Sequence, residues 1–134
     1  MTAFFDTNIL VTTVTSDPRK IPADQILGQG GFVSAQVLNE FTNVARKKLR
    51  HSWADIAYAV AQFRTAFDAV LPLTVETHSA ALGLARDHGL SFYDALIVAS
   101  ALEAGCDTLF SEDMQDGRAF GGLTIRNPFR EGQP

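Results

Sequence analysis

The sequence is short of the features that would place this protein outside the cell or in a membrane. It has a single cysteine, Cys106, so no disulfide can form within the chain. No apolar run is long enough to span a bilayer, and the first residues lack the basic and apolar pattern of a signal peptide. We therefore expect a soluble, cytoplasmic protein that does not associate with membranes, with Cys106 as a small buried residue and not a nucleophile.

Positive charge is also scarce. The 134 residues include 11 Lys and Arg against 15 Asp and Glu, for a formal net charge of -4. This balance argues against a protein that coats nucleic acid through bulk charge, but a nucleic-acid enzyme stays open because a metal ion can supply local positive charge. The hydrophobic content of 46% predicts a real core in one domain over residues 1–134.

Short apolar segments alternate with helical patterns along the chain. We expect strands in "TAFF", "FVS", "DTLFS" and "LTIRNPF", with "LPLT" as a connector or a strand and "EDMQDGRAFGG" as a polar loop. Residues 8–15 continue the first strand or open a helix, and residues 16–31 contain a short helix. Four long helices are predicted over residues 35–50, 52–70, 75–89 and 91–105. This alternation favours a parallel sheet with helices on both faces.

The helical patterns also predict which side chains are buried. Glu40 lies at the border of an apolar stripe, where an acid can lean over a cleft without full burial. Lys48 falls inside the same stripe, with its aliphatic stem along apolar surface. The run Ala95–Ala104 is apolar on nearly every side, which predicts a central helix. The helix over 52–70 is expected to bury Trp53, Ile56, Ala57, Val60, Phe63 and Phe67.

Four acids fall where such a sheet would gather a functional site. Asp6 interrupts the apolar stretch "FFDTNIL" directly after the first strand, and Asp113 follows the strand "TLFS". Glu40 lies in the helix after "FVS", and Asp94 opens the central helix. Sites in parallel α/β sheets form at the carboxyl ends of the strands, so these acids are expected to meet. Clustered carboxylates repel each other unless a cation intervenes, and oxygen ligands suit Mg²⁺ or Mn²⁺.

Each of these acids also has a structural explanation. Asp6 could cap a helix, Asp94 could form a capping box with Ser91, Asp113 could sit in a turn and Glu40 could be a solvated helix residue. Taken singly, structure is the better explanation for all but Asp6. Taken together, their order and their places at strand ends favour a catalytic or metal-binding role. The three histidines are scattered, so the sequence does not indicate a zinc site.

At these residues the sequence resembles the PIN-domain ribonucleases and, in size, the VapC-type toxins of type II toxin–antitoxin pairs. The matching motifs run from residue 4 to residue 129 and are "FFDTNIL", "SAQVLNEF", "SFYDALIVASAL", "LFSEDM" and "LTIRNPF". The resemblance implies a three-layer α/β/α PIN-like fold with a short parallel sheet of four to five strands. It also implies hydrolysis of RNA to a 5′-phosphate and a 3′-hydroxyl, a homodimer, and an antitoxin that blocks the cleft.

The same resemblance assigns roles to individual residues. The acidic site would consist of Asp6, Glu40, Asp94 and Asp113. Thr7 and Asn8 would orient the first acid, and Ser111 holds the small hydroxyl position before the last one. The family often has a further acid where this chain has Gln115, so Asp116, one place on, and Glu112 are only possible additional acids.

The hypothesis from these residues is metal-assisted hydrolysis. Asp6, Asp94 and Asp113 would hold one or two Mg²⁺ or Mn²⁺ ions, and Glu40 would bind metal or act as general base on the attacking water.

Because the net charge is negative, RNA binding would need a local cluster of positive charge. The segment "ARKKLRH" gathers Arg46, Lys47, Lys48, Arg50 and His51 at a helix end, where they could contact phosphates or simply complement the helix dipole. Further candidates are Arg19, Lys20 and Arg118. Tyr93 or Phe92 beside Asp94 could stack on a base, although core packing is the better explanation for Phe92.

Two other functions are weighed against a nuclease. A phosphatase or receiver domain that phosphorylates an aspartate also places an Asp after its first strand. The phosphatase pattern needs a second Asp at the position of Asn8, and a receiver needs a Lys after a late strand, which "TLFSEDM" lacks. A non-catalytic PIN-like module that binds RNA or protein is the other alternative, against which the intact set of acids argues. The RNA target is left open by the sequence.

Overall fold

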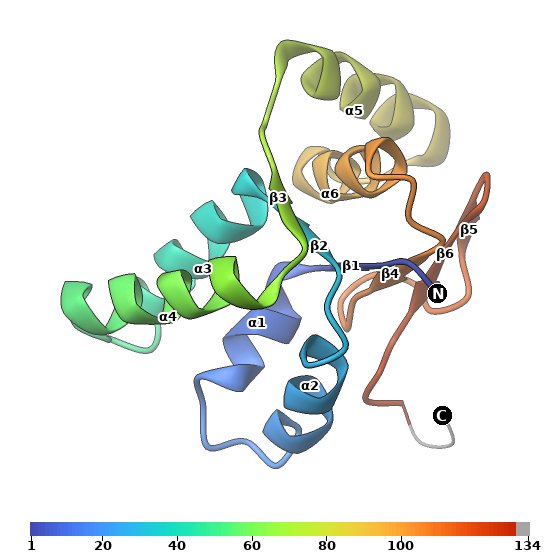
Figure 1. The fold of residues 1–134 in the computed structure, drawn as a ribbon. Coiled ribbons are helices and arrows are strands. Elements are labelled where there is room, and N and C mark those ends of the chain that lie inside the picture. The colour runs from blue at the N-terminus through green and yellow to red at the C-terminus, as the bar shows by residue number, and fades with distance from the viewer. Residues whose placement is uncertain (131–134) are drawn as a thin grey trace.

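A computed structural model describes residues 1–130 of the chain (Figure 1). The last four residues of the predicted domain lie outside the described part. The elements, in chain order, are β1 (Ala3–Phe5), α1 (Thr7–Thr13), α2 (Lys20–Leu27), β2 (Phe32–Ser34), α3 (Ala35–Lys47), α4 (Trp53–Ala66), β3 (Ala69–Leu71), α5 (Val75–His88), α6 (Phe92–Glu103), β4 (Thr108–Phe110), β5 (Ala119–Phe120) and β6 (Leu123–Arg126).

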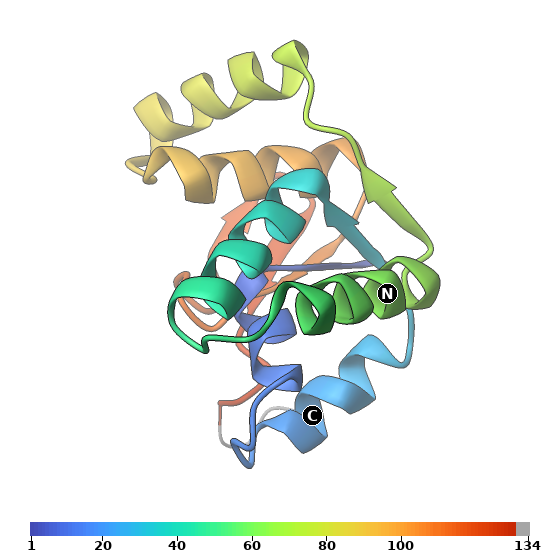
Figure 2. The same ribbon diagram turned by 90° about the vertical axis from the view of Figure 1, so that its left-hand side faces the viewer.

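The strands form one sheet in the order β3-β2-β1-β4-β6-β5. All neighbours are parallel except β5, which pairs antiparallel with β6. Helices α5 and α6 lie side by side over one face, and α1, α2 and α4 lie on the other (Figures 1 and 2). The predicted three-layer α/β/α class is confirmed, with six strands in place of four to five.

The helices begin where the sequence supplies capping side chains. The hydroxyl groups of Ser34, Ser52 and Ser91 accept hydrogen bonds from backbone N–H groups in the first turns of α3, α4 and α6. Helix α5 ends at Gly89, which adopts the left-handed conformation with φ of 67°. The segment 8–15, left undecided between strand and helix, lies mostly in α1, and Asp6 caps that helix with its own carboxylate.

Aromatic and aliphatic side chains of the strands fill the core. Phe4 and Phe5 of β1 are fully buried, and the ring of Phe5 lies 5.5 Å from that of Phe110 in β4. Helix α6 is buried continuously from Ala95 to Ala101, which confirms that it is the central helix. Cys106 is buried as expected, and burial raises the pKa of its thiol to about 11. No helix of the described residues is long and apolar enough to cross a membrane.

A glycine allows β2 to approach β1. Gly31 precedes β2 with φ of 140°, and a Cβ atom there would lie 2.6 Å from the carbonyl oxygen of Ala3. Only glycine avoids that collision and adopts this conformation without strain. The close approach, at the amino ends of the two strands, lets β2 pair in parallel with β1.

The predicted buried face of the helix over 52–70 is partly wrong. In α4 and the turn that follows, Ile56, Phe63 and Phe67 are buried and Val60 is half-buried, whereas Ala57 and Trp53 are exposed. The reason is that α4 lies at the outside of the molecule and packs along a narrower stripe than the apolar pattern implied. The guanidinium group of Arg46 instead lies over the Trp53 ring, with its Cζ atom 4.6 Å from the ring centroid.

Candidate active site

The four predicted acids face one pocket at the carboxyl edge of the sheet. Asp6 stands at the end of β1, Asp113 in the loop after β4, Glu40 in the second turn of α3 and Asp94 in the first turn of α6. Together they line a pocket of about 300 Å³, with Thr7, Asn8, Arg19, Lys48 and Glu112 also on its wall. Side chains that are separated by up to 107 positions in the chain thus meet because parallel strands end at one edge.

Asp6 is the buried centre of this site, with only 5% of the residue exposed. One carboxylate oxygen accepts the backbone N–H of Thr7 at 2.7 Å, and the other accepts the hydroxyl of Ser111 at 2.8 Å. Burial raises the pKa of Asp6 from its ordinary 3.8 to about 6, against the lowering effect of these two hydrogen bonds. The charges of Asp94 and Glu40 raise the pKa of Asp6 further.

Asn8 and Ser111 tie the loop after β4 to the start of α1. The Asn8 amide donates to Asp113 Oδ2 at 3.0 Å, and Asn8 Oδ1 accepts the backbone N–H of Glu112 at 3.1 Å. The Ser111 hydroxyl accepts the N–H groups of Asp113 and Met114. These bonds set the position of Asp113 relative to Asp6.

Glu40 and Asp94 complete the acidic wall. Glu40 accepts a hydrogen bond from Gln36 Nε2 at 3.0 Å and a longer one from Thr7 Oγ1 at 3.4 Å. Burial raises the pKa of Glu40, and the charge of Asp94 adds to the effect. Burial likewise raises the pKa of Asp94, with a further contribution from Asp113. The acids therefore destabilise one another's ionised forms, a conflict that a cation in the pocket relieves.

The donors fit a hard divalent cation held partly by water. Every acid on the pocket wall offers carboxylate oxygens, which Mg²⁺ and Mn²⁺ prefer. Within residues 1–130, no three His, Cys, Asp or Glu side chains gather closely enough to form a metal cage on their own. Mg²⁺ is typically bound through one or two carboxylates and keeps several waters, so the arrangement fits that ion and not a dehydrated site.

Two cations share the pocket wall with the acids. Arg19, a sequence candidate, pairs with Asp17 at 2.7 Å and with Glu112. Lys48 is exposed and lines the pocket. The sequence reasoning did not assign Lys48 to the site, although a lysine within an apolar stripe was the available signal. It also missed Gln36, one helical turn before Glu40.

Other candidates lie apart from the pocket. Asp116 accepts the Asn127 N–H and the Arg130 guanidinium, both at 2.7 Å, and the Asn127 hydrogen bond lowers its pKa. Arg118 donates to the His88 carbonyl and lies over the Phe120 ring.

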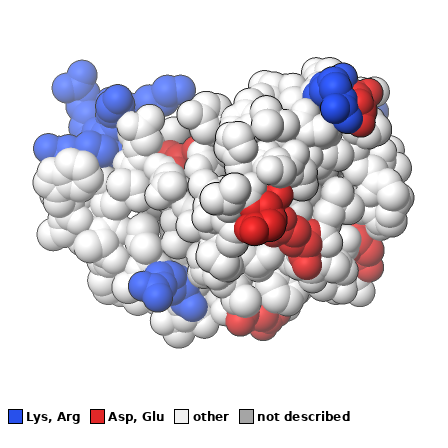
Figure 3. Space-filling model, turned by 90° about the horizontal axis from the view of Figure 1, so that it is seen from above, with Lys and Arg blue, Asp and Glu red and all other residues white. Residues whose placement is uncertain are grey.

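The basic cluster forms a separate hollow. Arg46, Lys47 and Arg50 line a pocket of about 360 Å³ at the end of α3. Figure 3 shows Lys and Arg side chains gathered at this end of the molecule.

The sequence model of the PIN domain matches residues 3–116. The chain belongs to the PIN-domain family. A comparison with curated proteins found no match.

Solved structures share the fold of this PIN domain. The Mycobacterium tuberculosis toxin VapC20, which cleaves the sarcin–ricin loop, is 20% identical over 84% of this chain and 90% of its own, with a TM-score of 0.70. A toxin–antitoxin complex from Klebsiella pneumoniae is 21% identical over 96% of this chain and 98% of its own, with a TM-score of 0.71. DNA-bound VapBC from Salmonella typhimurium is 18% identical over 96% and 98%, with a TM-score of 0.68.

The raised pKa of Asp6 predicts a pH-dependent stability. Because its folded pKa of about 6 exceeds the ordinary 3.8, the folded state binds this proton more tightly than the unfolded state. That stabilisation is complete below about pH 3.8 and is lost as the pH rises through 6. In metal-free protein, Asp6→Asn should therefore raise the free energy of unfolding at pH 7 by up to about 3 kcal/mol, and by much less near pH 4.

Urea unfolding of both proteins between pH 4 and pH 8 measures this difference. Added Mg²⁺ or Mn²⁺ should stabilise the wild type more than the variant. A wild type that equals the variant in stability throughout this pH range would contradict the buried, proton-binding Asp6.

Proposed function

We propose that this PIN domain is a metal-dependent endoribonuclease, the VapC-type toxin of a toxin–antitoxin pair. The observation that carries the proposal is the convergence of Asp6, Glu40, Asp94 and Asp113 on one pocket, with the central acid buried. The likeness to VapC and VapBC structures supports the assignment to toxins.

In this proposal Asp6, Asp94 and Asp113 would hold Mg²⁺ or Mn²⁺, which when bound would supply stabilisation of charge on a phosphoryl oxygen and a lower pKa for a water molecule. Glu40 accepts a proton from the attacking water, a role that its raised pKa suits because a general base works best near the operating pH. The water oxygen bonds to phosphorus as the bond to the 3′ oxygen breaks, and the 3′ oxygen takes up a proton from solvent, leaving a 5′-phosphate and a 3′-hydroxyl. Lys48 offers a positive charge to the same phosphate.

The alternatives fit the site less well. A phosphatase that phosphorylates Asp6 would need an acid at position 8, where the Asn8 amide instead holds Asp113. A receiver domain would need a lysine after β4, where the chain has Glu112 and Asp113. A non-catalytic module has no use for a buried acid that is repelled by its neighbours. The next experiment distinguishes such a module from a nuclease.

Replacing the acids should abolish cleavage. Asp6→Asn, Asp94→Asn and Glu40→Gln should each lower metal-dependent cleavage of total RNA by at least about a hundredfold. Asp116→Asn is the matched control, because that acid is bonded to Asn127 and Arg130 away from the pocket, and it should cleave like the wild type.

The assay uses partner-free protein with Mg²⁺, with Mn²⁺ and with a chelator. Discrete cuts that require both metal and the site acids support the nuclease. RNA binding without cleavage under either metal would overturn it in favour of the non-catalytic module.

We infer that the basic cluster of Arg46, Lys47 and Arg50 binds phosphates of the RNA backbone. These cations line their own hollow at the end of the helix that carries Glu40. The helix rise of 1.5 Å per residue puts Lys47 about 10 Å along α3 from Glu40. A strand bound at the acids can therefore reach them.

Removing two of these charges should reduce the salt dependence of RNA binding. For Lys47→Ala with Arg50→Ala, the slope of log K against log salt should fall in magnitude by about 0.7 for each lost phosphate contact. Fluorescence anisotropy with the Asp6→Asn background and a single-stranded RNA measures the slope. The control is Arg86→Ala, since Arg86 pairs with Asp87 on α5. An unchanged slope would leave only the helix-dipole explanation.

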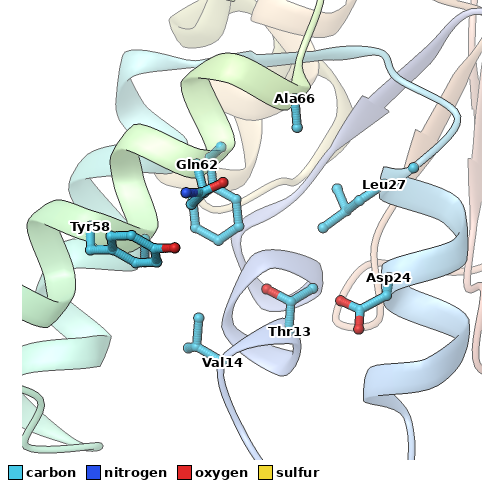
Figure 4. Close-up of a pocket in the computed structure, with 10 residues that line it drawn as sticks. Thr13, Val14, Asp24, Leu27, Tyr58, Gln62 and Ala66 are labelled. Carbon is cyan, nitrogen blue, oxygen red and sulfur yellow. The ribbon is translucent and has the colours of Figure 1, made fainter.

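We also infer an antitoxin partner that contacts the groove between α1, α2 and α4. The relatives solved as toxin–antitoxin complexes support such a partner. The groove has a volume of about 400 Å³, and its wall includes Val14, Leu27, Ala66 and the exposed ring of Tyr58 (Figure 4). Its apolar lining suits side chains of another protein. The homodimer and the cytoplasmic location stay predictions of the sequence.

A charged side chain in the groove should weaken binding of the antitoxin. Ala66→Arg, at an exposed position, should lower affinity for the proposed antitoxin by at least about tenfold, because a cation would face apolar side chains. Cleavage of RNA by the partner-free variant should be unchanged. Titration of the antitoxin into the cleavage assay measures both, and full inhibition of the variant at wild-type concentrations would place the contact elsewhere.

A further inference from the structure

A second hollow lies beside the acidic pocket. It has a volume of about 360 Å³ and is formed by Gln36, Asn39, Glu40 and Asn43 of α3 together with Tyr93 of α6. It shares Glu40 with the acidic pocket, and Tyr93 directly precedes Asp94. Whatever enters this hollow is therefore next to the proposed reacting phosphate.

Tyr93 presents an aromatic ring to solvent at this point. The residue is 62% exposed, although burial would be favourable for so large a side chain. Its ring contacts that of Phe92 edge to face, with 6.0 Å between centroids. The Ser91 cap fixes the first turn of α6, and with it the backbone from which the Tyr93 ring projects. Exposed aromatic rings at such positions stack on nucleic-acid bases.

Three amide side chains face the same hollow from α3. Gln36, Asn39 and Asn43 are spaced three and four residues apart, so they lie on one face of the helix. The Gln36 amide is engaged with Glu40, whereas Asn39 and Asn43 are exposed on the pocket wall. An amide offers both donors and an acceptor, which matches the mixed edge of a nucleobase.

The polar face of α3 continues beyond the amides to the basic cluster. Lys47 follows Asn43 by four residues, and Arg50 follows the end of the helix. Along this face Asn39 stands one residue before the acid Glu40, Asn43 stands three residues after it, and the cations lie beyond. A base held by these amides next to the cleaved phosphate could therefore be followed by backbone phosphates of the same strand at the cations.

We propose that this hollow is a nucleobase pocket that holds the base next to the cleaved phosphodiester of a single-stranded RNA. Tyr93 stacks on the base, and Asn39 and Asn43 hydrogen-bond to its edge. Bases are accessible to such contacts only where they are unpaired, so the substrate class is a loop or single strand and not a duplex. The proposal rests on the proposed ribonuclease function.

The test uses synthetic single-stranded RNAs built on a cut site found in total RNA, with each of the four bases at the two positions that flank the cut. The wild type should prefer one base at one position. Tyr93→Ala should lower kcat/KM by about tenfold to a hundredfold, whereas Tyr93→Phe should stay within about threefold because stacking needs only the ring. Asn39→Ala with Asn43→Ala should flatten the preference between bases.

Leu82→Ala is the control for loss of an exposed apolar side chain, since Leu82 is 54% exposed on α5 and lines none of the pockets described above. It should match the wild type in rate and preference, and melting temperatures check that each variant is folded. Cleavage by Tyr93→Ala and by the double variant with wild-type rate and preference would overturn the base pocket while leaving the ribonuclease intact. Absence of metal-dependent cleavage by the wild type itself would overturn the ribonuclease and the base pocket together.

Discussion

The buried carboxylate of Asp6 is the constraint on which the site depends. Burial of an acid is costly unless its oxygens are satisfied, and here Thr7 and Ser111 supply hydrogen bonds from two different segments. Those bonds require α1 to start directly at the end of β1 and the loop after β4 to turn back over it. The pKa of Asp6 still stays well above its ordinary value, so the bonds do not fully offset burial and neighbouring charge. The site therefore keeps an affinity for protons or cations.

This constraint sets the places of the other acids. Asn8 and Ser111, which fix Asp6 relative to the sheet, also hold the loop that carries Asp113. Helix α3 brings Glu40 to the pocket, and the central helix α6 brings Asp94. The acids are close enough to raise one another's pKa values, yet they are not closed into a cage among the described residues. This arrangement suits the hydrated ion and the phosphate that the proposed ribonuclease would bind together.

Helix α3 carries both an acid of the site and the polar groups proposed to bind RNA. A protein with a net charge of -4 repels RNA at long range, so affinity for the proposed RNA substrate would have to come from local groups. One polar face of α3 carries Glu40, then Asn43, then the cations Lys47 and Arg50 at its end. The opposite face packs Val37, Phe41 and Ala45 into the core, which holds the polar face rigidly. In the proposed ribonuclease, the geometry of substrate binding would follow from the period of this one amphipathic helix.

The sequence by itself determined most of the elements and singled out the four acids. Its alternation of strands and helices, its caps at Ser34 and Ser91 and the acids after "AFF" and "TLFS" are local signals, because they depend on near neighbours in the chain. The tertiary structure decided which polar groups share a pocket. It brought Lys48 and Gln36 to the acids and placed Asp116 and Arg118 elsewhere. It also left Trp53 outside the core and added the short strand β5. Those outcomes depend on how helices cross the sheet and on contacts between residues far apart in the chain, which no local pattern encodes.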